Sequence, residues 1–160
     1  AVGDAFAVAL LERKGFTKED FAKSHPGGSL GKQLLLSIGD IMHTGEEIPV
    51  VCSDDSLSTG LIEMSQKALG MTAVVDKDNK IAGIFTDGDL RRTLESNVDI
   101  KATKMSDVMT AKPFVLSADT LAYNAVSLIQ EKRITSIIVT KENKVIGALN
   151  IHDLFRAGLM

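Results

Sequence analysis

The feature that most constrains the fold of this 160-residue chain is an internal repeat. Three blocks recur at a spacing of 64 residues without a gap: 49–51 with 113–115, 75–83 with 139–147, and 89–92 with 153–156. Upstream, residues 40–42 match 107–109 at a spacing of 67, which leaves three extra residues in the first copy's loop 43–48. The chain is therefore two copies of one unit of about sixty residues, preceded by a separate N-terminal segment.

Each copy has the same predicted order of elements, β-α-β-β-α. The expected strands are 50–52, 72–75 and 81–85 in the first copy, and 114–116, 136–139 and 145–149 in the second. Helices are expected from residues 57 and 121, and second helices from 87 and 151. Asn79 and Asn143 suit the turns because Asn tolerates positive φ. Asp55 and Asp119 are expected to cap the first helix of each copy.

The N-terminal segment differs from the repeats. Its first eleven residues read as a helix that is apolar on nearly every side, with Asp4 the only charge before Glu12. Such a helix needs burial on all faces, and the rest of the chain offers too little surface to cover it. We therefore expect a piece of a longer protein, cut just inside a larger domain, rather than an amphipathic helix packing on its own core.

The composition excludes several classes of function. The net charge is −3, with one Tyr and no Trp, so neither a basic face nor an aromatic platform for nucleic acid is expected. The single cysteine, Cys52, excludes an internal disulfide and fits a reducing, cytoplasmic setting. No apolar run approaches the ~18 residues needed to cross a membrane.

The sharpest candidate site is Gly83-x-x-Thr86-x-x-Asp89, where a predicted strand ends and a helix begins. The unpaired N–H groups and the dipole of a helix N-terminus attract phosphate. Thr86 can donate to a phosphate oxygen, and the acceptor-only carboxylate of Asp89 suits a ribose diol. The alternative is that Thr86 or Asp87 simply caps the helix.

The second copy departs from this motif at one position. Asn150 stands where the first copy has Thr86, whereas Asp153 keeps the ribose-binding position. His152 is expected either to contact phosphate or to be solvated. A second nucleotide site is therefore expected, with a weaker contact at the hydroxyl position.

Further residues are candidates for a base pocket or for phosphate binding. Two groups are expected to line the clefts: Ile48, Val50, Met71, Thr72 and Ala73 in one, and Lys112, Phe114, Thr135 and Ser136 in the other. The alternative for most of them is ordinary sheet core. Four arginines match phosphate oxygens in geometry: Arg91, Arg92, Arg133 and Arg156. Each is otherwise a solvated side chain. His43, in the longer loop 43–48, is expected to be solvated, the alternative being that it approaches a cleft.

No metal site is expected. The carboxylates at 76, 78, 87 and 89 are not followed by a ligand set with the spacing of a calcium-binding loop.

The doubled β-α-β-β-α unit with Gly83-Ile-Phe-Thr-Asp-Gly-Asp89 resembles the CBS domain, over roughly residues 37–160. Two units in tandem look like a Bateman module. The resemblance implies an α/β (α+β) fold in which two sheets pack about a pseudo-two-fold axis. It also implies nucleotide binding in the clefts between the repeats and pairing of modules into homodimers.

The segment Ser24-His-Pro-Gly-Gly28, with Gly15–Phe21 before it, resembles the end of the sugar-isomerase (SIS) domain of arabinose-5-phosphate isomerases. The resemblance implies a division into residues 1–36 from that domain, a CBS domain at 37–100 and another at 101–160. The parent enzyme would interconvert ribulose 5-phosphate and arabinose 5-phosphate for the lipopolysaccharide sugar Kdo. His25 would reach its active site, as the catalytic residue of the parent only.

The function expected of the present chain is regulatory and not catalytic, since the catalytic domain is missing. The resemblance implies no cofactor, and an effector that is either CMP-Kdo, as feedback, or an adenine nucleotide. The expected partners are this small molecule, the chain's own SIS domain and further copies of the chain. The alternative is a structural module that drives oligomerisation without a ligand.

Overall fold

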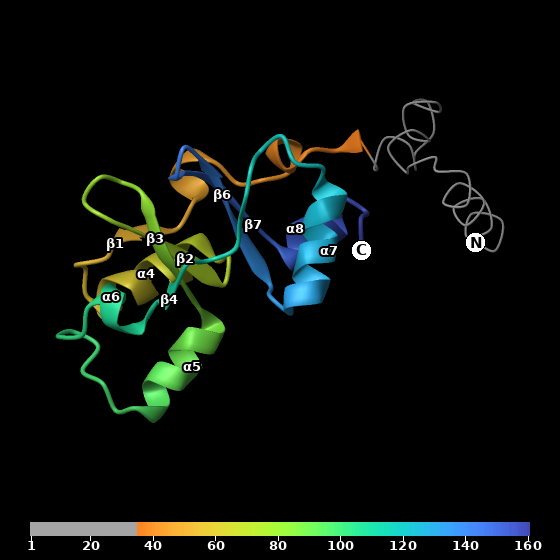
Figure 1. Ribbon diagram of the computed structural model, residues 1–160. Coiled ribbons are helices and arrows are strands. Elements are labelled where there is room, and N and C mark those ends of the chain that lie inside the picture. Colours follow the sequence, from red (N-terminus) through yellow and green to blue (C-terminus); the bar gives the residue numbers. More distant parts are fainter. Residues whose placement is uncertain (1–34) are drawn as a thin grey trace.

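The computed structural model describes residues 35–160, which form the two predicted repeats (Figure 1). The first repeat comprises β1 (Val50–Cys52), α4 (Leu57–Lys67), β2 (Met71–Val75), β3 (Ile81–Thr86) and α5 (Asp87–Glu95). The second comprises β5 (Val115–Leu116), α7 (Ala122–Lys132), β6 (Ser136–Lys141), β7 (Lys144–Asn150) and α8 (Ile151–Arg156). The shorter elements are η1 (Ile38–Asp40), η2 (Gly45–Glu47), α6 (Met105–Val108) and β4 (Thr110–Ala111). The predicted order β-α-β-β-α is confirmed in both repeats.

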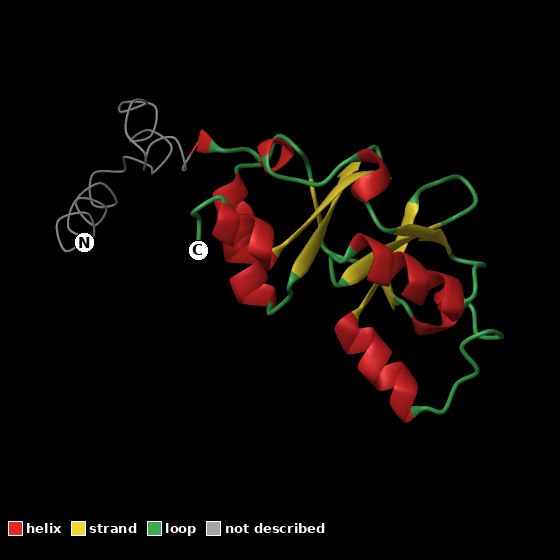
Figure 2. Ribbon diagram, turned by 180° about the vertical axis from the view of Figure 1, so that it is seen from behind, coloured by secondary structure: helices red, strands yellow, loops and turns green. Residues whose placement is uncertain are grey.

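Each repeat builds one sheet with helices on its outer side (Figures 1 and 2). The sheet orders are β1-β2-β3-β4 and β5-β6-β7, with the first strand of each repeat parallel to the second and the next pair antiparallel. Side chains alternate between the two faces of a strand. Val74 and Phe85 accordingly face the helices, whereas Ala73 and Ile84 pack toward the other repeat, against Ile138.

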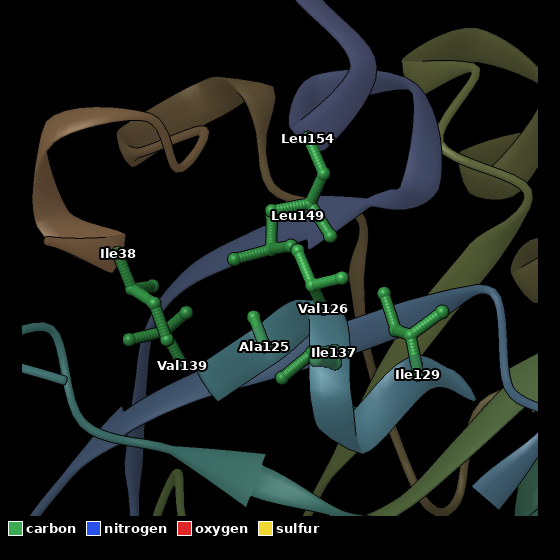
Figure 3. Close-up of a cluster of buried hydrophobic side chains, with 8 residues drawn as sticks. All are labelled: Ile38, Ala125, Val126, Ile129, Ile137, Val139, Leu149 and Leu154. Atoms are coloured by element: carbon green, nitrogen blue, oxygen red, sulfur yellow. The ribbon is translucent and has the colours of Figure 1, made fainter. Parts of the chain in front are cut away.

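The core of the second repeat lies between its sheet and its helices (Figure 3). Ile137, Val139 and Leu149 of the sheet contact buried residues of α7 and α8. Ile38 belongs to the same cluster, although it precedes the first repeat in sequence.

Each repeat is completed by the segment that leads into the other repeat. His43 forms an isolated antiparallel bridge with Ala148 of β7, and β4, which precedes the second repeat, pairs with β3 of the first. The two glycines that the repeat conserves receive this segment: a Cβ at Gly83 would overlap the sulfur of Met109, and one at Gly147 that of Met42. The repeated residues 40–42 and 107–109 therefore each supply a methionine that packs against a glycine of the other repeat's sheet.

The strand registers correct the sequence alignment of the two copies. Met71 pairs with Thr86, and Ser136 pairs with Asn150, the counterpart of Thr86, so the first three elements correspond at a spacing of 65 and not 64. The turn of the first repeat is one residue longer, which restores the spacing of 64 from β3 onward. The loop at 43–48 thus has two extra residues, at 46 and 47, because Gly45 and Lys112 correspond and share positive φ. The turn residues Asn79 and Asn143 have positive φ, as predicted.

The predicted caps of the first helices are wrong. Asp55 accepts from the Cys52 N–H, and Ser56 caps α4 by accepting from the Thr59 N–H. In the second repeat the N-cap residue of α7 is Leu121, without a side-chain cap, and Asp119 lies two residues before it. The expectations for residues 1–34, His25 included, lie outside the described residues.

Candidate functional site

The predicted Gly-x-x-Thr-x-x-Asp motif forms a closed capping box at the start of α5. The Asp89 N–H donates to Thr86 Oγ1 at 3.4 Å, and Asp89 Oδ2 accepts from both the N–H and the hydroxyl of Thr86 at 2.8 Å. Thr86 is therefore the N-cap residue, whereas Asp87 begins the helix. The alternative reading as a helix cap is correct for Thr86, and it leaves the ligand role open, because a hydroxyl can exchange its partner.

The second repeat forms the same box with a different residue. Asn150 Oδ1 accepts from the N–H groups of His152 at 2.9 Å and Asp153 at 3.2 Å, and Asp153 Oδ2 accepts from the Asn150 N–H at 2.8 Å. The six-residue helix α8 is shorter than the nine-residue α5. Among the described residues, both caps accept from the N–H of their aspartate, and Asn150 accepts from the His152 N–H as well, whereas Thr86 makes no such second contact.

Each buried aspartate also binds an arginine and one residue from the exchanged segment. Asp89 Oδ1 accepts from Arg92 at 2.5 Å and from the Thr110 hydroxyl at 2.8 Å. Asp153 Oδ1 accepts from Arg156 at 2.8 Å and lies 2.9 Å from His43 Nε2. Thr110 was not predicted. The expectation of a solvated His43 is wrong, and the alternative that it approaches a cleft is correct. Thr110 and His43 directly follow Met109 and Met42 of the repeat, and this equivalence could have indicated that they occupy the same place in the two repeats.

A cavity of about 510 Å³ opens beside the first box, and we refer to it as the first cleft. It brings together nine of the predicted site residues: Thr86, Asp87, Asp89, Arg91, Arg92, Phe114, Arg133, Thr135 and Ser136. It also holds Lys112 and the unpredicted Ile84, Gly88, Thr110, Pro113 and Ile134. One wall thus comes from β3 and α5, and the opposite wall from the approach to β5 and the start of β6.

The first cleft is rich in cations. Arg91, Arg92, Lys112 and Arg133 line it, against the two acids Asp87 and Asp89. Asp89 is already neutralised by Arg92, so the other three cations face the cavity with one exposed carboxylate. Phe114 adds an aromatic face that is 46% exposed. Cations, helix N–H groups and an exposed ring together suit a ligand that carries both a phosphate and a planar group.

The region around Asn150 and Asp153, which we call the second cleft, differs from the first. Asn150 and His152 line a cavity of about 280 Å³ that also borders Asp87, Thr135 and Ser136 of the first cleft, and Asp153 lines another, of about 390 Å³, with His43. Residues at the positions of the first-cleft cations are Phe155 for Arg91, Arg156 for Arg92, Gly45 for Lys112 and Ala68 for Arg133. The second cleft therefore retains one of the four cations.

Most of the residues predicted to line the other base pocket lie in the interior. Ile48, Met71 and Ala73 are buried in the cluster between the two sheets. Thr72 is fully buried and donates its hydroxyl to the Gly60 carbonyl at 3.3 Å, and Val50 is half-buried. Phe114 and Thr135 of the other predicted group are exposed in the first cleft, but at the spacing of 65 they correspond to Pro49 and Gly70, so the two predicted groups are not counterparts.

The contacts of His43 change the pKa of its ring. Burial disfavours the charged ring, but hydrogen bonds to Asp153 and Glu47 outweigh it and raise the pKa above the ordinary 6.5. Within residues 35–160, no group of three His, Cys, Asp or Glu side chains is placed to bind a metal ion. The same part of the chain contains no helix that is long and apolar enough to cross a membrane.

Comparison with known proteins agrees with the two-repeat fold. The family model for the CBS domain matches twice, at residues 38–96 and 105–159. The arabinose 5-phosphate isomerases KdsD of Pseudomonas aeruginosa and Escherichia coli are 49% and 50% identical over 99% of this chain. The chain spans about half the length of these curated relatives, 49% and 48%. A crystal structure of CBSX2 in complex with AMP is 26% identical with a TM-score of 0.66, over 78% of this chain and 96% of that one.

Proposed function

Because this chain belongs to the CBS domain family and contains two such domains, we propose that it is a regulatory module that binds a nucleotide in the first cleft. The observation that carries the proposal is the Thr86–Asp89 box, which opens into a cavity lined by four cations. A phosphate would take the hydroxyl of Thr86, which then releases a lone pair of Asp89 Oδ2 for a ribose hydroxyl. Asp89 itself stays neutralised by Arg92.

The comparison with CBSX2 supports a nucleotide, since that protein is described in complex with AMP. The similarity to KdsD supports a role in an arabinose 5-phosphate isomerase, with residues 1–36 the end of its SIS domain and His25 contributing to catalysis there. In that setting the module works in the cytoplasm and senses either CMP-Kdo or an adenine nucleotide. A ligand preferring one arrangement of the module would shift the attached catalytic domain accordingly.

Oligomerisation without a ligand is the second candidate function. The outward faces of three helices carry large exposed apolar side chains: Ile62 of α4, Leu94 of α5 and Phe155 of α8. Such side chains favour a homodimer formed through helices. Dimerisation is compatible with ligand binding, so only the ligand response separates the two proposals.

Calorimetric titration of the 160-residue chain with AMP, ATP, CMP and CMP-Kdo tests the proposal. We expect at least one of them to bind at a single site per chain and to raise the melting temperature. Arg133→Ala should weaken that ligand about tenfold, whereas Lys141→Ala, an exposed cation outside the cleft, should not change its affinity. If none of the four ligands gives heat or a change in melting temperature, and the chain still dimerises, nucleotide binding is rejected and oligomerisation without a ligand is favoured.

A further inference from the structure

His43 lies between two carboxylates and lines a different cavity from the first cleft. Its Nε2 is 2.9 Å from Asp153 Oδ1, and its Nδ1 is 3.0 Å from Glu47 Oε2. The His43 side chain is 24% exposed and that of Asp153 is 5% exposed, whereas Glu47 is largely in solvent. A neutral imidazole has one N–H and can donate to only one of these carboxylates, whereas imidazolium donates to both.

The backbone of His43 also joins two segments that are far apart in sequence. The His43 N–H donates to the Ala148 carbonyl at 2.8 Å, and the Ala148 N–H donates to the His43 carbonyl at 3.2 Å. These two bonds attach the segment Ser37–Ile48 to β7, beside the contact of Met42 with Gly147. The segment is the connection between residues 1–34 and the first repeat.

The first repeat has a neutral group in the equivalent place. Thr110 occupies the position of His43, and its hydroxyl donates to Asp89. The two residues by which the loop of the first copy is longer are Glu46 and Glu47, so the insertion supplies the second carboxylate that faces His43. The insertion and the histidine together replace the hydrogen bond from a hydroxyl to a carboxylate by a contact of the ring with two carboxylates.

We propose that His43 is a proton-controlled clasp, which in its protonated form fastens the segment Ser37–Ile48 to the second repeat through Asp153 and Glu47. The charged groups that face it are Glu47 from η2, and Asp153 and Arg156 from α8. Arg156 shares Asp153 Oδ1 with the ring and opposes its charge, but the two carboxylates outweigh one guanidinium. The clasp requires no nucleotide and is therefore independent of the proposed function.

The sign of the effect follows from the raised pKa of His43. The folded chain binds the proton more tightly than the unfolded chain, so the clasp contributes fully below about pH 6.5. The contribution is lost as the pH rises through the pKa of the folded state. Loss of the clasp frees the segment locally and exposes Asp153, while the first repeat keeps its Thr110 contact.

Amide hydrogen exchange of the full 160-residue chain between pH 6 and pH 8.5, corrected for the intrinsic rates, tests this. We expect the protection of the His43 and Ala148 amides to fall about threefold or more as the pH rises. The amides of Ile84 and Thr110, at the equivalent place in the first repeat, should keep a constant protection. His43→Thr, which installs the residue of the first repeat, should abolish the pH dependence.

Two further variants separate the clasp from a general effect of histidine or of folding. Glu47→Gln removes an exposed carboxylate, so it should leave the chain folded and move the loss of protection to lower pH. His152→Gln, which changes an exposed histidine of the same motif, should keep the wild-type profile. A pH-independent protection in the wild type, or an unchanged profile in His43→Thr, would overturn the proposal.

Discussion

The two repeats share one capping geometry and differ in what surrounds it. In both, an N-cap side chain and an aspartate three residues later close the box at the start of the last helix. In the first repeat the box opens onto Arg91, Lys112 and Arg133, whereas the second repeat has no cation at the equivalent positions. The capping box is therefore a structural feature of both repeats. The cations around the box of the first repeat are what distinguish it as a candidate binding site.

The difference also extends to the group that meets the aspartate. A neutral Thr110 hydroxyl contacts Asp89, whereas an ionisable ring contacts Asp153. The bond between Thr110 and Asp89 has one charged partner, whereas protonated His43 and Asp153 are both charged, so a ligand displaces Thr110 more readily than a protonated His43. The first repeat is thus arranged for a ligand and the second for an internal contact.

The largest effect is expected from giving the first cleft the residues of the second. The triple variant Arg91→Phe, Lys112→Gly, Arg133→Ala removes three cations, each contributing about 1 kcal/mol to phosphate binding. Nucleotide affinity should fall about 100-fold in calorimetry. The backbone should tolerate the change, because glycine is favoured at the positive φ of Lys112.

A matched control removes the same charge elsewhere, at the exposed Lys101, Lys141 and Lys144, each changed to Ala. This control should keep the affinity within about threefold, since screened charges at a distance contribute little. An equal loss in both triple variants would mean that net charge, and not the first cleft, determines binding.

A smaller effect is expected from exchanging the N-cap residue alone. Thr86→Asn installs the cap of the second repeat, so the free energy of unfolding should stay within about 0.5 kcal/mol while nucleotide affinity falls about tenfold. Thr86→Val should lose about 1 kcal/mol of stability as well as the affinity. Urea denaturation and calorimetry on the same samples separate the two quantities. Wild-type affinity in Thr86→Asn would show that the hydroxyl does not contact the ligand.

Much of the fold could be predicted because the two copies check each other. A strand, turn or helix start found in one copy was found again in the other, and the predicted order of elements is confirmed. The prediction of the helix caps failed because several polar residues precede α4. The sequence does not indicate that Ser56, rather than Asp55, accepts the free N–H of the helix. The predicted spacing of 64 was wrong for the first three elements because the turn is one residue longer in the first copy. Only the strand pairing reveals this difference.

The motif of the candidate site could be predicted more readily than its walls. Thr86 and Asp89 stand at a strand-to-helix junction that is visible in the sequence, whereas Thr110 and His43 come from segments that cross between repeats. No local pattern indicates that crossing. Met71 and Ala73 have the same alternating pattern whether they face a cleft or the other sheet, so their burial could not be predicted.

NMR mapping of the bound nucleotide tests most directly whether the first cleft, and not the second, is the binding site. Amide resonances of ¹⁵N-labelled chain would be followed while AMP or CMP-Kdo is added, whichever binds more tightly. We expect the changes in amide chemical shift to be concentrated in residues 84–92, 110–114 and 133–136. The resonances of residues 43–47 and 148–156 should change little. Shifts centred on the second cleft, or of equal size in both, would contradict the claim that the first cleft alone is arranged for a ligand.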